Sequence, residues 1–267
     1  MKQRILARHP SDLTIDWAQR VIGGNHPNVM VSGVDIRSVD TGTTTRVRLE
    51  VMHDGPGNLP RQWFVKLPSL AWRARLITAL PRLLHTEVRF YNEAAQGMPI
   101  AMPDVLAAQS APGRGAILVL ADVAESGAIS GQPGDILTDA QALLVVRQLA
   151  RLHARFWNKA DFMRTYQWLA GPVRRLEDRL GAALAVPLMR RGLRCAGHLV
   201  PRKLHKLAVR YARQRARAMR FLSSAPPTLV HHDCHPGNLF WNETQPGLLD
   251  WQLMRFGEGI SDVAYLL

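Results

Sequence analysis

The chain has 267 residues, enough to bury a substantial core as one large domain or as two small lobes. Hydrophobic residues at 47% and charged residues at 21% are typical of globular rather than disordered proteins. No run approaches the roughly 18 consecutive apolar residues of a membrane-spanning helix, and the charged N-terminus lacks the apolar region of a signal peptide. Two cysteines, Cys195 and Cys234, are too few for a disulfide framework, so we expect a protein of the reducing cytoplasm.

The formal net charge is +13. Nucleic acid, an acidic membrane surface or an anionic small ligand could each explain this excess, and so could a general arginine bias with no partner at all. The sequence has no recognisable nucleic-acid-binding motif and no aromatic residues interleaved with the basic ones. We therefore expect no nucleic-acid partner.

The first part of the chain is predicted to be rich in strands. A short helix opens it, with Ser11 or Asp12 as the cap and apolar residues on one face through Val21. A second helix is predicted at residues 83–96. Strands are expected at residues 31–40, 46–54, 61–69 and 116–123.

The second part is predicted to be mainly helical and to follow the glycine-rich stretch 124–135. A long helix covers residues 138–157, with Thr138 or Asp139 as its cap. Residues 173–221 are helical and arginine-rich, with breaks expected at Pro187, Gly192, Gly197 and Pro201. Short strands then follow within residues 228–233, 237–242 and 247–252.

The stretch "LVHHDCHPGNLFW", residues 229–241, contains three histidines, an aspartate and a cysteine in succession. A zinc site is one interpretation, but Pro236 and Gly237 interrupt any helix and neither cysteine belongs to a C-x-x-C pair. A metal-dependent phosphohydrolase with a His-Asp doublet is another, but its ligands should lie on helices. Strand followed by loop is predicted here, which favours a catalytic loop.

Five separated residues form a pattern that suits phosphoryl transfer from a nucleotide. Asp233 is followed after five residues by Asn238, and Asp250 stands on the next strand. Lys66 ends an apolar strand, and Glu87 lies on the helix after it. The reaction needs a carboxylate for the attacking hydroxyl, an amide and a carboxylate for Mg²⁺, and a lysine steadied by a glutamate. The spacing from aspartate to asparagine equals that of the kinase pattern H-R-D-x-x-x-x-N.

Each of these residues also has an ordinary explanation. A lysine at a strand end is most often solvated, a glutamate on a helix is often a surface charge, and Asp250 could cap a turn. A carboxylate on an apolar strand near a second carboxylate is nevertheless more often functional. Asp122 and Asp262 are expected to be structural and to bond backbone amides in turns.

The segments "HHDCHPGN", "LLDWQ" and "ISDVAYLL" resemble the aminoglycoside phosphotransferase and choline kinase-like family. The triplet "DWQ" is similar to the ecdysteroid kinase-like branch in particular. The resemblance implies an α+β, bilobal protein kinase-like fold, with a β-rich nucleotide-binding N-lobe (1–123) and a mainly helical C-lobe (124–267) that carries the catalytic loop and the acceptor-binding helices. Members of this family generally continue with further helices after the last segment, so we expect these C-terminal helices to be shortened here.

The resemblance also implies a role for each residue of the pattern. Asp233 would be the catalytic base, and Asn238 and Asp250 would bind Mg²⁺. Lys66 would contact the phosphates of ATP or GTP, with Glu87 as its partner.

Further nucleotide contacts follow by resemblance. Ala121 and Val123 in "LADV" would offer backbone groups to the base, and Gly42 and Thr43 in "DTGTTT" would form the phosphate loop. In the catalytic loop itself, the histidines would orient the backbone, His232 would replace a common glycine, and Cys234 would be passive.

The function implied is transfer of the γ-phosphoryl group of ATP or GTP to a hydroxyl of a small molecule. The region 173–220, which would line the acceptor site, is rich in arginine and lysine and contains only Glu177 and Asp178 as acids. Coulomb repulsion then disfavours a polycationic aminoglycoside or choline. We expect a neutral or anionic acceptor. The alternative is a catalytically impaired nucleotide-binding protein that acts as a scaffold or sensor.

Overall fold

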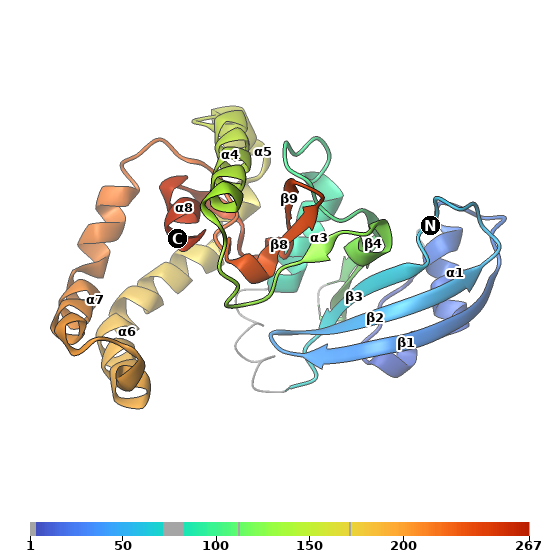
Figure 1. The fold of residues 1–267 in the computed structure, drawn as a ribbon, viewed down its shortest axis with the longest axis horizontal. Coiled ribbons are helices and arrows are strands. Elements are labelled where there is room, and N and C mark those ends of the chain that lie inside the picture. The colour runs from blue at the N-terminus through green and yellow to red at the C-terminus, as the bar shows by residue number, and fades with distance from the viewer. Residues whose placement is uncertain (1–3, 72–82, 112, 171, 267) are drawn as a thin grey trace.

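The structure is a computed structural model that describes residues 4–71, 83–111, 113–170 and 172–266. A β-rich part is followed by a mainly helical part, the α+β order that the sequence predicts (Figure 1). The helices are α1 (Ile15–Gly23), α3 (Leu83–Glu93), α4 (Asp139–Phe156), α5 (Ala160–Thr165), α6 (Pro172–Ala196), α7 (Arg202–Leu222) and α8 (Ile260–Leu266). None of the helices described is both long and apolar enough to span a membrane.

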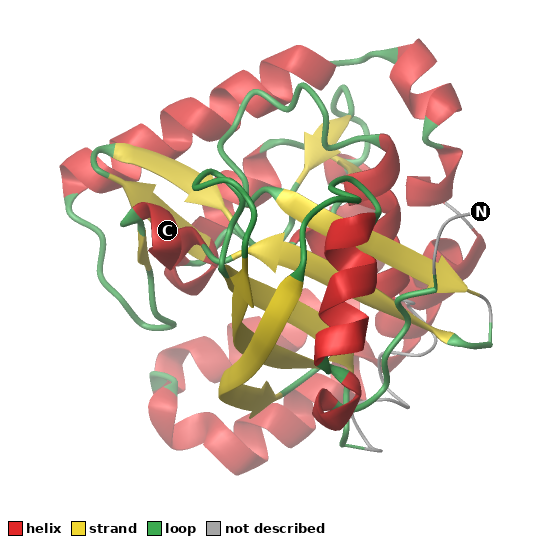
Figure 2. Cartoon of the chain, turned by 90° about the vertical axis from the view of Figure 1, so that its right-hand side faces the viewer, coloured by secondary structure: helices red, strands yellow, loops and turns green. Residues whose placement is uncertain are grey.

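The strands form one large antiparallel sheet and two small ones (Figure 2). The large sheet has the order β1-β2-β3-β5-β4, built from β1 (Val31–Thr41), β2 (Thr44–His53), β3 (Gln62–Pro68), β4 (Val105–Ala111) and β5 (Gly115–Ala121). The small sheets belong to the second part of the chain, and β6 lies near the start of that part. They consist of β6 (Ile129–Ser130), β8 (Leu239–Asn242) and β9 (Gln245–Leu248), and of β7 (Thr228–Val230) with β10 (Arg255–Gly257).

Helices α1 and α3 pack against opposite faces of the large sheet. Along β5, Ile117 and Val119 join the core beneath α1, whereas Leu118 and Leu120 join the core that contains α3. This alternation follows from the two-residue period of a strand. On β3 the neighbours of Lys66 in sequence face α1, so Lys66 itself faces α3.

The core on the α3 side also contains residues of the second part of the chain. It joins α3 and β5 to α4, β7 and the strands β8 and β9. Phe90 of α3 stacks on Trp251 with ring centroids 4.7 Å apart. The predicted lobe boundary between residues 123 and 124 falls in the short 3-10 helix Val123–Ser126 and stays a prediction.

Three local expectations are wrong. Asp250 does not lie on a strand: β9 ends at Leu248, and Asp250 has a left-handed backbone with φ 60°. The cap of α1 is Thr14, whose side chain accepts a hydrogen bond from the Trp17 N–H (3.3 Å), rather than Ser11 or Asp12. Helix α6 also continues through Pro187, and through Gly192, although an interior proline removes a helical hydrogen bond and costs about 3 kcal/mol. Packing of α6 against α7 offsets this cost, and the break falls only at residues 197–201.

We expect Trp251→Ala to lower the free energy of unfolding by about 3–5 kcal/mol, because Trp251 is fully buried and its removal leaves a cavity beside Phe90. Trp157, which is 49% exposed, is the matched control, and Trp157→Ala should change the free energy by less than about 1 kcal/mol. Urea denaturation measures both. Equal effects of the two substitutions would contradict the role given to the stack.

Candidate active site

The ammonium group of Lys66 joins three separate elements. Its Nζ donates to both carboxylate oxygens of Glu87, at 2.8 and 2.9 Å, and to Oδ1 of Asp250 at 3.0 Å. The backbone N–H of Trp251 donates to the same Glu87 carboxylate at 3.2 Å. Only 4% of Lys66 and 0% of Glu87 is exposed. Strand β3, helix α3 and the segment after β9 therefore meet at one buried cation.

One positive charge faces two carboxylates in this cluster, and the pKa values reflect that imbalance. Although burial opposes its charge, the carboxylates of Asp250 and Glu87 raise the pKa of Lys66. Burial likewise opposes the charge of Asp250, but Lys66 holds its pKa below the ordinary value. Burial raises the pKa of Glu87 to about 7, and Lys66 offsets this only in part. Glu87 is therefore the carboxylate that takes up a proton first.

Asn238 fixes the loop that carries Asp233. Its Nδ2 donates to the backbone carbonyl of Asp233 and to carboxylate Oδ2 of the same residue, both at 2.9 Å. The N–H of Leu249 donates to the backbone carbonyl of Asn238 at 2.8 Å, which brings the loop beside the segment that leads to Asp250. Because Nδ2 is engaged, Oδ1 is the atom of Asn238 that can bind a metal.

Asp262 of α8 holds the start of this loop. Its carboxylate accepts the backbone N–H groups of His231 (2.9 Å) and His232 (2.7 Å) and a hydrogen bond from Nε2 of His153 on α4 (2.9 Å). Nε2 of His231 in turn donates to the carbonyl of Leu249 at 2.8 Å. The predicted structural role of Asp262 and the predicted orienting role of His231 are confirmed.

The other members of the histidine cluster are also structural. His232 has φ 68°, in the left-handed region that favours glycine, which agrees with the prediction that it replaces one. Nδ1 of His235 accepts the N–H of Gly237 at 3.1 Å. Burial raises the pKa of the Cys234 thiol. Among the described residues, no group of three or more His, Cys, Asp or Glu side chains is placed to hold a metal.

A cavity of about 710 Å³ opens in front of these groups, a volume suited to a small-molecule ligand. Seven of the predicted site residues line it: Thr43, Lys66, Ala121, Val123, Asp233, Asn238 and Asp250. Glu87 lies buried behind Lys66. Gly42 is not a lining residue, and its carbonyl accepts a hydrogen bond from Oγ of Ser69 at 2.7 Å.

The structure sharpens the predicted contact with the nucleotide base. The N–H of Ala121 donates to the carbonyl of Asp104 at 2.9 Å, and the carbonyl of Val123 accepts from Oγ of Ser126 at 2.9 Å. We therefore expect the carbonyl of Ala121 and the N–H of Val123, rather than these two engaged groups, to contact a base.

The sequence interpretation missed two arginines of the cavity. Arg46 and Arg48 on β2 both line it, and Arg46 is the cross-strand partner of Lys66. Arg48 pairs with Asp122 at 2.7 Å, while the same carboxylate accepts the N–H of Ala124 at 3.1 Å, so the predicted amide-bonding role of Asp122 is confirmed. Directly opposed residues of paired strands share a face, but the register that places Arg46 opposite Lys66 comes from the structure and not from the sequence.

Tyr265 was also missed. It lies on α8, three residues after Asp262, and its ring is 6.3 Å from that of His235. Partial burial and a hydrogen bond to the negative carboxylate of Asp233 raise the pKa of Tyr265. A tyrosine hydroxyl thus accompanies Asp233 in the loop region.

The donor atoms near Asp250 fit a magnesium ion. Gln252 lines the cavity and is 7% exposed. Its Oε1 is buried without a hydrogen-bond partner, whereas its Nε2 lies 3.4 Å from Oδ2 of Asp250. The available metal donors are all oxygens: Oε1 of Gln252, the carboxylate of Asp250 and Oδ1 of Asn238. Hard cations such as Mg²⁺ prefer oxygen ligands.

The sequence profile of the "phosphotransferase enzyme family" matches residues 50–267 of this chain. The chain belongs to this family. Solved structures similar to this family member include the GDP complex of aminoglycoside 2'-phosphotransferase-IIIa, with 14% identity, 94% of this chain and 77% of that chain covered, and a TM-score of 0.55. Ethanolamine kinase of Plasmodium vivax shares 12% identity over 93% of this chain and 65% of that chain, with a TM-score of 0.51.

At these identities the two likenesses show the fold, and they confirm the predicted protein kinase-like architecture of this phosphotransferase family member. No curated protein sequence matches the chain. The resemblance to the ecdysteroid kinase-like branch stays a prediction.

The pKa of Glu87 predicts how the stability of the protein changes with pH. Between pH 4.5, the ordinary pKa of a glutamate, and pH about 7, the carboxyl group of Glu87 has lost its proton in the unfolded chain but keeps it in the folded protein. The stabilising contribution is therefore complete below this window and is lost as the pH rises through it, by about 3 kcal/mol. Glu87→Gln should remove this slope, whereas Glu93→Gln on the exposed part of the same helix should keep it. Urea denaturation across the window measures the slope, and an unchanged slope in Glu87→Gln would refute the assignment.

Proposed function

We propose that this chain is a nucleotide-dependent phosphotransferase that moves the γ-phosphoryl group of ATP or GTP to a hydroxyl of a small molecule. The observation that carries the proposal is the convergence on one cavity of the Lys66–Glu87 pair, the Asp233–Asn238 loop and Asp250. Phosphoryl transfer needs little covalent chemistry from the protein and depends on positioning and on electrostatic stabilisation. Each of these groups either positions a reactant or stabilises charge.

Asp233 is the proposed catalytic base. Its carboxylate orients the hydroxyl of the acceptor and takes its proton as the new oxygen–phosphorus bond forms. The bond between the γ-phosphorus and the β–γ bridging oxygen breaks in the same step, and nucleoside diphosphate leaves. The amide of Asn238 holds Oδ2 of this carboxylate, and so keeps the side chain in one orientation. The hydroxyl group of Tyr265 is a second group positioned at the same carboxylate.

Lys66 and the oxygen ligands act on the phosphates. Glu87 holds the ammonium group of Lys66 at the cavity wall, where it neutralises phosphate charge. Asn238 and Asp250 would hold Mg²⁺, with Oε1 of Gln252 beside them, and the bound ion would supply further neutralisation of the phosphate charges.

The base of the nucleotide is proposed to lie against Ala121 and Val123, with Thr43 and the neighbouring Gly42 near the phosphates. The edge of adenine presents one amine donor and one ring acceptor, which the carbonyl of Ala121 and the N–H of Val123 complement. A solved neighbour of similar fold is a complex with GDP, and so both ATP and GTP stay in the proposal.

A neutral or anionic acceptor fits the charges of the helical part best. Helix α7 contains many arginines and lysines and neither aspartate nor glutamate. The side chains of Glu177 and Asp178 lie outside the described part of the structure. A cationic acceptor would be repelled by α7, so the acceptors named for the neighbours, an aminoglycoside and ethanolamine, are not proposed for this chain.

The test separates nucleotide binding from turnover. We expect Asp233→Asn to bind Mg²⁺–nucleotide like the wild type and to lose turnover by about 10²–10⁴-fold, because the proton acceptor is gone. Asp250→Asn should lose magnesium-dependent nucleotide binding, and the exposed Asp16→Asn serves as the control. Calorimetry measures binding, and release of nucleoside diphosphate with water or a panel of hydroxyl compounds measures turnover.

Unchanged turnover in Asp233→Asn would overturn the catalytic assignment. A wild type that binds Mg²⁺–nucleotide but releases no diphosphate with any acceptor would instead favour the alternative, a nucleotide-binding protein without catalysis.

A further inference from the structure

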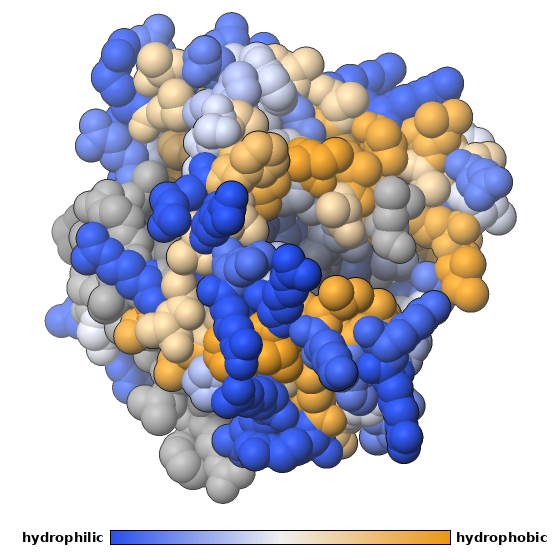
Figure 3. All heavy atoms as spheres, turned by 90° about the vertical axis from the view of Figure 1, so that its left-hand side faces the viewer, coloured by the Kyte–Doolittle hydropathy of each residue, from blue (hydrophilic) through white to orange (hydrophobic). Residues whose placement is uncertain are grey.

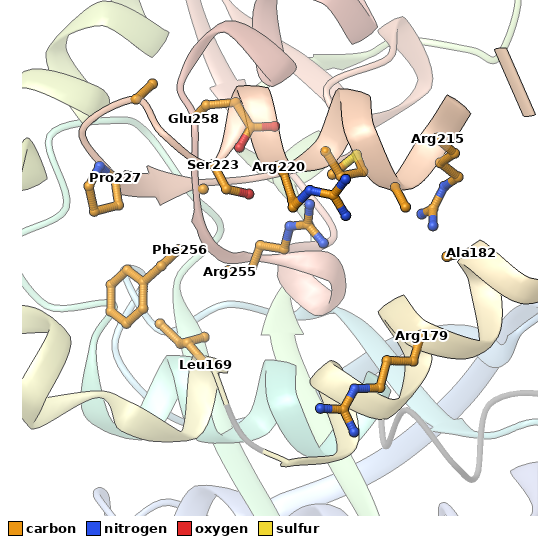
Figure 4. A pocket seen from close by; sticks show the side chains of 14 residues that line it. Leu169, Arg179, Ala182, Arg215, Arg220, Ser223, Pro227, Arg255, Phe256 and Glu258 are labelled. Carbon is orange, nitrogen blue, oxygen red and sulfur yellow. The ribbon is translucent and has the colours of Figure 1, made fainter. Parts of the chain in front are cut away.

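The described wall of the nucleotide cavity carries two arginines besides Lys66. Arg46 and Arg48 both come from β2. A second hollow, between α6, α7 and β10 on the face of the molecule drawn in Figure 3, is also rich in arginine, but none of its described lining residues also lines the nucleotide cavity (Figure 4). Of the arginines that the structure describes, Arg46 and Arg48 are therefore the ones placed to meet a phosphate chain in the nucleotide cavity.

Arg46 lies on the same face of the sheet as Lys66. The two residues are directly opposed on the paired strands β2 and β3, and directly opposed residues share a face. The guanidinium also reaches the turn between β1 and β2, because a Cβ atom added to Gly42 would lie 3.7 Å from Nη2 of Arg46. Gly42 and Thr43 of this turn are proposed to lie near the phosphates. Arg46 is thus close to both parts of the protein that are proposed to contact the phosphate chain.

The ion pairs of the two arginines differ. Arg48 pairs through Nε with Asp122 at 2.7 Å, and its guanidinium lies 5.6 Å from the ring centroid of Phe64. The Asp122 side chain is only 6% exposed, so this pair is anchored in the wall. Arg46 donates to Asp40, whose side chain is 66% exposed. Because water screens both charges of an exposed ion pair, the pair contributes little to stability, and the guanidinium of Arg46 can leave Asp40 for a more strongly charged partner.

We propose that Arg46 binds the phosphate chain of the nucleotide together with Lys66 and leaves Asp40 to do so. This role rests on the proposed function and adds a residue to its phosphate site. The guanidinium offers a planar fork of N–H donors that matches two phosphate oxygens, and a triphosphate carries several negative charges where Asp40 carries one. In the absence of nucleotide, Asp40 keeps the guanidinium at the wall of the cavity, which Asp40 also lines.

An ordinary structural role is the alternative. Asp40 and Arg46 are directly opposed on β1 and β2, and in this alternative their pair serves only to stiffen the hairpin. The two partners are then equivalent, because the loss of either one breaks the pair. In phosphate binding they are opposites, because Arg46 attracts a phosphate and Asp40 repels it. Substitution of each partner therefore separates the two roles.

Calorimetry on the full chain, with Mg²⁺ at fixed salt and without an acceptor, measures the binding of three kinds of probe. These are the non-hydrolysable analogues AMP-PNP and GMP-PNP, the nucleosides adenosine and guanosine, and inorganic tripolyphosphate. Arg46→Gln should weaken the binding of the tighter analogue and of tripolyphosphate at least tenfold and leave that of the nucleosides unchanged, because residue 46 contacts only the phosphates. Arg46→Lys keeps the charge but not the fork, and its affinities should fall between those of the wild type and Arg46→Gln.

Two further variants complete the set. Asp40→Asn breaks the same pair from the other side and should bind the phosphate probes at least as tightly as the wild type, because a negative charge has been removed from the cavity. Arg37→Gln is the matched control, since Arg37 also pairs across β1 and β2, with Glu50, but is not among the lining residues. This control should leave the affinities for all three kinds of probe unchanged. Circular dichroism checks the folding of each variant.

Unchanged binding of the phosphate probes in a folded Arg46→Gln variant would overturn the role of Arg46 and leave the proposed function intact. Equal weakening by Arg46→Gln and Asp40→Asn would assign the pair to the hairpin and would overturn the role as well. A wild type that binds tripolyphosphate through Arg46 but neither analogue would overturn the proposed function and keep the phosphate site. A wild type that binds none of the phosphate probes would overturn both.

Discussion

A buried ammonium group is stable only where carboxylates surround it, and the position of Lys66 imposes this condition on the centre of the molecule. Its partners come from sequence positions that are far apart: Glu87 on α3 and Asp250 after β9. Loss of either carboxylate would leave a buried charge partly uncompensated, which is strongly unfavourable. Electrostatic attraction therefore fixes the relative positions of the sheet, α3 and the segment before Trp251, and the stack of Phe90 on Trp251 adds to it.

The loop that carries Asp233 depends on a second carboxylate in a comparable way. Asp262 lies on α8, 29 residues after Asp233. Its carboxylate accepts hydrogen bonds from backbone amides of the loop and from His153 of α4. Although burial opposes its charge, the hydrogen bonds from His153 and from the amides lower the pKa of Asp262. The final described helix is thus part of the scaffold of the site, and Tyr265 on the same helix reaches Asp233.

Much of this arrangement was predictable from sequence, because it depends on local periodicity and fixed spacing. Apolar segments bounded by turn residues predicted β2, β3 and β5, and the family resemblance implied the pairing of Lys66 with Glu87. The five-residue spacing from Asp233 to Asn238 marked the loop; the chemical roles of these residues stay predictions.

What sequence could not supply depends on packing between distant elements. The continuity of α6 through Pro187 is one such case, because it rests on the contact of α6 with α7. Arg46 became a candidate only when the register of β2 with β3 placed it opposite Lys66. Strand β4 escaped prediction because most of its residues are half-buried and it lacks the continuous apolar run of its neighbour β5.

The attachment of the loop to Asp262 has a consequence for how this sequence can vary. The contact uses the backbone N–H groups of His231 and His232, which nearly every amino acid possesses, so the imidazole of His232 is not needed for it. Evolutionary drift at position 232 is limited instead by the left-handed backbone there, which admits glycine and asparagine and resists valine or isoleucine. Position 262 tolerates less substitution, because only a carboxylate has two oxygens that accept hydrogen bonds from two amides and an imidazole at once.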